Sequence, residues 1–71
     1  MIVQPAKDKL IKDFELMREF EESARDFYLK VCVDPSVEKE QVKQIFKDVA
    51  KDEEQHVKIV QEIIALIESI K

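Results

Sequence analysis

The chain has 71 residues, of which 45% are hydrophobic and 39% charged, with no glycine and a formal net charge of −4. This composition indicates one small, helix-rich domain rather than a disordered chain. The acidic balance argues against nucleic-acid binding, and the mixed charges offer no basic patch for an anionic membrane surface.

Neither a signal peptide nor a membrane span is predicted. The first residues, MIVQPAKDKLIKDF, interrupt their apolar content with Lys and Asp, and the longest apolar run covers only residues 63–67. The single cysteine, Cys32, cannot form an internal disulfide, and the chain has no CxxC pair for a rubredoxin-type iron centre of its own. We therefore expect a cytoplasmic protein.

The pattern predicts a single domain of two long helices joined by one turn. Pro5 suits the first turn of a helix, and nothing interrupts the pattern until about residue 33, so the first helix is expected over about 5–33. Asp34-Pro35 is typical turn chemistry, which places the turn at about 34–37. Asp34 or Ser36 is the expected N-cap of the second helix, over about 37–70.

Each predicted helix has an apolar stripe with a carboxylate at its centre. At 100° per residue, the first stripe is centred on Glu21 and the second on Glu53, with His56 in the same arc as Glu53. The apolar members of the first stripe are Leu10, Phe14, Met17, Ala24, Tyr28 and Cys32. Those of the second are Val42, Phe46, Val49, Val57, Val60, Ile64 and Ile67.

An antiparallel hairpin would bring these three ionisable residues together. Because the rise per residue is constant, Glu21 and Glu53 lie at similar depth when the chain folds about its turn, and His56 is one helical turn from Glu53. We therefore expect an all-α fold. Because two helices alone cannot enclose a core, we also expect the chain to form a homodimer with a four-helix bundle, or a higher homo-oligomer. Glu22 and Glu54 lie about 100° from the stripes and are predicted to be solvated.

The polar layer of such a dimer suits a metal site. Four ionised carboxylates in a dry core are costly, and two divalent cations would balance their charge. Carboxylate and imidazole donors suit iron, manganese or zinc. The sequence therefore predicts metal ligation by Glu21, Glu53 and His56 of both chains. The alternative is a polar layer that only fixes how the helices pair.

These residues resemble a rubrerythrin-type, ferritin-like di-iron carboxylate domain. The resemblance is carried by Glu21, seven residues before Tyr28 and directly before "ESARDFY" (residues 22–28), and by Glu53-x-x-His56 in "FKDVAKDEEQHVKIV". It implies two iron ions per dimer and supporting roles for Asp52, which would orient a ligand histidine of the opposing pair, and Tyr28, which would bond a ligand carboxylate. The chain departs from the family in supplying two helices where the family has four.

The resemblance implies an oxidoreductase that reduces peroxide or oxidises ferrous iron. Since the chain has no electron-transfer module of its own, a peroxidase would need an external electron donor. Two other hypotheses remain at this point. One is a non-catalytic iron-binding component of a larger assembly, and the other is a structural helical dimerisation module.

Overall fold

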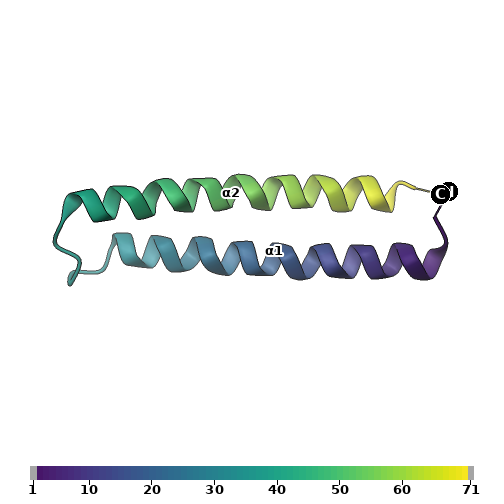
Figure 1. Cartoon of the computed structure of the whole chain (residues 1–71), viewed down its shortest axis with the longest axis horizontal. Helices are drawn as coiled ribbons and strands as arrows, with labels where there is room; N and C mark the ends of the chain where they lie inside the picture. Colours follow the sequence, from purple (N-terminus) through teal and green to yellow (C-terminus); the bar gives the residue numbers. More distant parts are fainter. Residues whose placement is uncertain (1, 71) are drawn as a thin grey trace.

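The computed structural model describes residues 2–70 and shows an antiparallel helical hairpin. Helix α1 spans Gln4–Cys32 and helix α2 spans Glu40–Glu68, with 29 residues in each. The helices lie side by side along their whole length, and both ends of the chain are at the same end of the hairpin (Figure 1). No strand occurs between residues 2 and 70. The predicted all-α, two-helix hairpin is therefore confirmed, as a single layer of helices.

Contacts along the hairpin fix the register of the two helices. At the open end, the Lys7 ammonium donates hydrogen bonds to the carbonyl oxygens of Glu68, at 3.0 Å, and Ile70, at 2.6 Å. Near the turn, the Cys32 thiol donates to the Lys43 carbonyl at 3.4 Å. Lys7 also places a positive charge at the C-terminus of α2, where the helix dipole is negative.

The start of α2 differs from the sequence-based expectation. The helix begins at Glu40 after an extended Lys39, so neither Asp34 nor Ser36 is its N-cap. Instead, Asp34 Oδ1 accepts hydrogen bonds from the backbone N–H of Ser36, at 2.9 Å, and from the Ser36 hydroxyl, at 2.8 Å. These bonds lower the pKa of the Asp34 carboxyl. The carboxylate stabilises the turn itself rather than the helix that follows it.

The buried core of the hairpin lies on α2. Its five buried residues are Ala50, Val57, Val60, Ile64 and Ile67. No residue of α1, within Gln4–Cys32, is buried to the same degree. Long α1 side chains such as Phe14, Arg18 and Tyr28 are half-buried, as expected if they cover the shorter aliphatic side chains opposite them. Both faces of the layer remain open.

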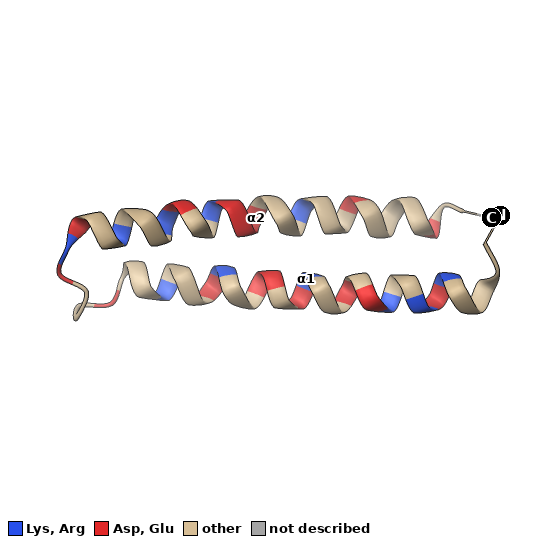
Figure 2. Ribbon diagram, in the orientation of Figure 1, with Lys and Arg blue, Asp and Glu red and all other residues tan. Residues whose placement is uncertain are grey.

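Much apolar surface is exposed in a single chain. Met17, predicted to lie in the central stripe of α1, is 45% exposed, and Phe20 and Phe27 are 69% and 60% exposed. Figure 2 shows charges of both signs along all of α1, whereas the C-terminal half of α2 is mostly uncharged. A hairpin covers only the part of each stripe that faces the other helix, which accounts for the exposure of Met17. Neither helix of the described chain is apolar enough over a sufficient length to cross a lipid bilayer.

Candidate metal centre

The three predicted ligands lie together near the middle of the hairpin. Glu21 comes from α1, and Glu53 and His56 come from successive turns of α2, so that one donor atom from each lies within 4.8 Å of the other two. His56 Nδ1 is 3.3 Å from Glu21 Oε2 and 3.7 Å from Glu53 Oε1. The helical spacing of Glu53-x-x-His56 points both α2 side chains at the same α1 carboxylate.

The geometry is compatible with a metal ion of the predicted class. Carboxylate oxygens and imidazole nitrogens bind Zn²⁺ at about 2.0–2.2 Å, so donors on opposite sides of one ion are at most about 4.4 Å apart. The observed limit of 4.8 Å is slightly wider, and small side-chain rotations would close the difference. The donor set of two carboxylates and one imidazole is of borderline softness and suits iron, manganese or zinc.

Without an ion, the two carboxyl groups interact with each other. A hydrogen bond with Glu21 raises the pKa of Glu53, and partial burial and the negative charge of Glu21 raise it further. Two adjacent carboxylates repel each other, so the pair favours holding a proton, and a bound cation would relieve the same repulsion.

The ligands are covered on one side and open on the other. The side chains of Glu21 and Glu53 are 25% and 18% exposed, whereas that of His56 is 52% exposed. The opening is a groove of about 320 Å³ lined by Met17, Glu21, His56, Ile59, Val60 and Ile63. We call this side of the hairpin the site face. Its walls are apolar apart from Glu21 and His56, so these ionisable side chains are set in an apolar surface.

The opposite side of the hairpin, which we call the charged face, has a different lining. Its groove is formed by Arg25, Leu29, Lys47, Ala50, Lys51 and Glu54. At 100° per residue, Met17 and Arg25 lie about 40° to either side of Glu21. On α2, His56 and Glu54 likewise lie on either side of Glu53. The two carboxylates therefore point between the helices, along the boundary between the two faces.

The two predicted supporting residues are not joined to the ligands within one chain. Asp52 is exposed, on the flank of α2 that also carries His56, and its negative charge adds to the effects that raise the pKa of Glu53. The Tyr28 ring packs against Phe46, with ring centroids 5.8 Å apart. No hydrogen bond from Tyr28 or Asp52 to Glu21, Glu53 or His56 is present within residues 2–70. Their roles remain predictions, and that of Asp52 involves a histidine of a second chain.

The structure also shows a polar contact that the sequence reasoning missed. Glu54, predicted to be solvated, is half-buried and accepts a hydrogen bond of 2.6 Å from Arg25 Nη1. The sequence did contain a sign of this contact. Arg25 is a cation within about 40° of the centre of an apolar stripe, where it needs a polar partner. Glu22, also predicted to be solvated, lies 3.5 Å from Arg18 Nε in an ion pair within α1.

Comparison with known proteins finds no family model, no curated protein and no solved structure that matches the chain. The resemblance to rubrerythrin-type domains therefore depends on the spacing of Glu21, Tyr28, Asp52, Glu53 and His56 alone.

Proposed function

We propose that the protein is a di-iron carboxylate oxidoreductase whose metal site forms between two copies of the chain. The observation that carries the proposal is the convergence of Glu21, Glu53 and His56, from two helices, beside an open apolar groove that Glu21 and His56 line. Ionisable groups at the centre of an apolar surface are costly to cover unless something balances their charge. A pair of divalent cations would do so.

The proposed partner is a second hairpin seated on the site face. The groove walls include Met17 and Ile59, which are 45% and 47% exposed in one chain. Covering them with an identical surface would produce a four-helix bundle with two-fold symmetry and a continuous apolar interior. Two copies would supply four carboxylates and two imidazoles, which is the ligand set of two ions.

Each ligand would have a distinct task in such a bundle. The carboxylates of Glu21 and Glu53 would hold the ions and balance their charge, and His56 would complete the donor set from the next turn of α2. The apolar walls around Met17, Ile59 and Ile63 would limit water at the site. When bound, two ferrous ions supply the two electrons that reduce hydrogen peroxide to water or begin the reduction of dioxygen, and a separate reductant must restore them.

A structural polar layer is the second candidate, and one observation favours it. The 3.3 Å contact between His56 Nδ1 and Glu21 Oε2, with Glu53 Oε1 3.7 Å from the same nitrogen, gives these side chains polar partners without a metal ion. In that case the layer would fix the pairing of the helices, as buried polar groups do in some coiled coils.

An anaerobic titration of the metal-free protein with Fe(II) distinguishes these functions. We expect saturation at one iron per chain, and oxidation of the bound iron when peroxide or air is added. Glu53→Ala should lose at least about 100-fold in iron affinity, because it removes one ligand and leaves the neighbouring groups unpaired. Glu22→Ala is the matched control, since Glu22 is adjacent to a proposed ligand but pairs with Arg18.

The outcomes separate the candidates. Stoichiometric binding that requires Glu53 but not Glu22, with repeated turnover when a reductant is supplied, supports the oxidoreductase. Stoichiometric binding without turnover supports a non-catalytic role in iron handling. If both variants bind iron as tightly as the parent, the assignment of Glu53 as a metal ligand is wrong. If neither the parent nor the variants bind iron, there is no iron site. Both results favour the structural layer.

A further inference from the structure

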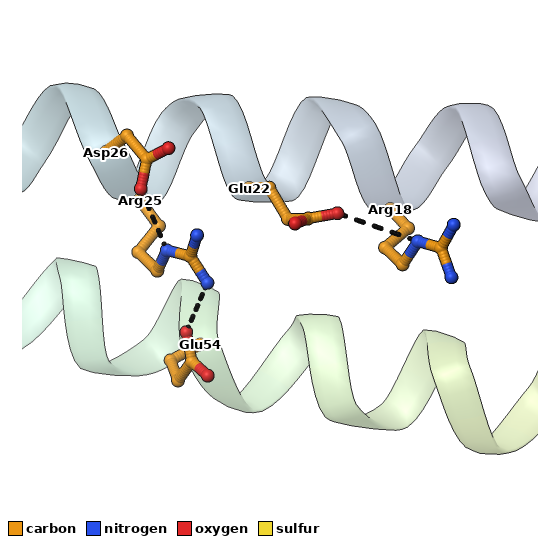
Figure 3. A network of polar contacts seen from close by, with 5 residues as sticks. All are labelled: Arg18, Glu22, Arg25, Asp26 and Glu54. Atoms are coloured by element: carbon orange, nitrogen blue, oxygen red, sulfur yellow. Dashed lines mark hydrogen bonds and ion pairs between the residues drawn. The ribbon is translucent and has the colours of Figure 1, made fainter.

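Arg25 connects the two helices on the charged face. Its Nη1 donates a hydrogen bond of 2.6 Å to Glu54 Oε2 on α2, and its Nε donates one of 3.0 Å to Asp26 Oδ1 on its own helix. Figure 3 shows the guanidinium extending from α1 to reach the Glu54 carboxylate, with Asp26 on the α1 side of it. The Arg25 side chain is 24% exposed, so part of it lies against the helix pair rather than in solvent.

The Arg25–Glu54 pair lies directly beside the proposed ligands. On α1, Arg25 is four residues after Glu21, which is one helical turn or about 6 Å along the axis. On α2, Glu54 is bonded through the backbone to Glu53. The pair and the ligands therefore share the same short segments of both helices. A contact across the charged face limits the rotation of each helix about its axis, and that rotation decides where Glu21 and Glu53 point.

We propose that Arg25 and Glu54 are positioning residues, which hold α1 and α2 in the rotation that aligns Glu21 with Glu53 and His56. This inference rests on the proposed metal site and adds to it two residues that do not ligate metal. Groups that orient metal ligands commonly affect affinity by about 10–100-fold without touching the ion.

The substitution Arg25→Ala tests the proposal, because positioning and simple charge repulsion predict opposite changes in metal affinity. Arg25 is a cation near a proposed cation site, so Arg25→Ala removes a repulsion and should strengthen metal binding if only the Coulomb interaction matters. If Arg25 holds the helices in position, the same substitution should weaken binding. The sign of the change therefore separates positioning from simple electrostatics.

The chain contains a matched control pair. Arg18 and Glu22 also form an Arg–Glu ion pair, with Nε 3.5 Å from Oε1 and with side chains 33% and 41% exposed. Both residues belong to α1, so this pair joins two turns of one helix and does not connect α1 to α2 (Figure 3). Arg18→Ala removes the same type of cation at a similar distance along α1 from Glu21, without removing a contact between the helices.

The experiment measures Co(II) affinity and the visible absorption of bound Co(II), which reports its coordination geometry. We expect Arg25→Ala to weaken binding about tenfold and to change the absorption intensity, and Arg25→Lys to have an intermediate effect, because lysine keeps the charge but not the planar fork. Arg18→Ala should remain within about twofold of the parent. The exchange Arg25→Glu with Glu54→Arg should recover most of the lost affinity.

Metal-free protein supplies an independent readout. The ¹⁵N signals of the His56 imidazole depend on its contact with Glu21, so Arg25→Ala should shift them and Arg18→Ala should not. Unchanged or stronger Co(II) binding in Arg25→Ala, with unshifted His56 signals, would overturn the positioning role. If the parent itself does not bind Co(II), the proposed metal site fails, and the His56 signals alone decide whether Arg25 aligns the polar layer.

Discussion

The two faces of the hairpin both carry carboxylates, but they differ in the groups that lie next to those carboxylates. On the charged face, the Glu54 carboxylate meets a guanidinium at 2.6 Å, and lysine side chains surround the groove. At the boundary of the site face, two carboxylates and an imidazole meet one another beside methionine and isoleucine side chains, and the Arg25 guanidinium one helical turn away is bonded to Glu54 instead. The charged face pairs its Glu54 carboxylate with a cation within one chain, whereas the site face combines carboxylates with exposed apolar surface, which the second chain of the proposed dimer would cover.

The largest expected effect comes from placing a charge on each face in turn. Met17 and Leu29 are equally exposed apolar residues of α1, at 45% and 46%, but they line grooves on opposite faces. Met17→Glu should weaken the proposed dimer by about 3 kcal/mol or more, roughly 100-fold, because it buries a negative charge beside the Glu21 carboxylate, one helical turn away. Leu29→Glu should leave the dimer intact. Analytical ultracentrifugation over a range of concentrations measures both, and equal behaviour of the two variants would contradict the assignment of the interface.

A second prediction concerns the pH dependence of the metal-free protein. The pKa of Glu53 is raised above its ordinary value of 4.5, so the folded state binds more protons than the unfolded chain as that group titrates. The contribution of Glu53 to the free energy of unfolding is therefore greatest below pH 4.5 and falls as pH rises through the raised pKa. The Glu53→Gln variant cannot ionise at this position and should not lose that contribution. The free energy of unfolding of the variant, relative to that of the parent, should therefore increase from pH 4 to pH 7.

Urea unfolding at several pH values measures that difference, and parallel stability curves for the parent and Glu53→Gln would contradict it. Asp34 should show the opposite dependence of stability on pH, because hydrogen bonds from Ser36 lower the pKa of its carboxyl below 3.8. The stabilisation from Asp34 is present above pH 3.8 and disappears as pH falls through the lowered pKa. Asp34→Asn should therefore lose stability relative to the parent as pH rises through this range, whereas Glu53→Gln gains it.

The smallest expected effect is on the charged face. Arg18→Ala breaks an ion pair whose members are 33% and 41% exposed and 3.5 Å apart. Exposed pairs of this kind within one helix contribute about 0.5 kcal/mol or less, since water and salt screen them. Thermal unfolding should therefore shift little, and the shift should shrink further in 1 M salt. A large, salt-independent loss would show that the charged face contributes more to the fold than its exposure implies.

The sequence was sufficient to predict the parts of the structure that depend on helical periodicity. The hairpin, the position of Pro5 at the start of α1, and the meeting of Glu21, Glu53 and His56 follow from 100° per residue and a constant rise. The sequence reasoning was wrong about the start of α2, because Asp34 satisfies the backbone of its own turn and the chain stays extended to Lys39.

Periodicity could not predict contacts that depend on side-chain length. A helical wheel sorts residues by direction and polarity, and so it treats Glu54 as a solvated residue about 100° from the stripe centre. The Arg25 guanidinium reaches it because the long arginine side chain lies along the surface of the pair before its charged end meets a partner. Asp52 lies beyond this kind of prediction for a different reason, because its predicted contact is with a histidine of a second chain.

All three proposed ligands are encoded in one short chain, and this has a genetic consequence. In a symmetric bundle of two identical chains, one codon change alters two ligand positions at once, so selection cannot adjust the environment of one ion without changing the other. A bundle with a single altered ligand would exist only where two alleles are expressed together. Mixed dimers of parent and Glu53→Ala chains would reproduce that state in the test tube and show whether one intact half retains activity.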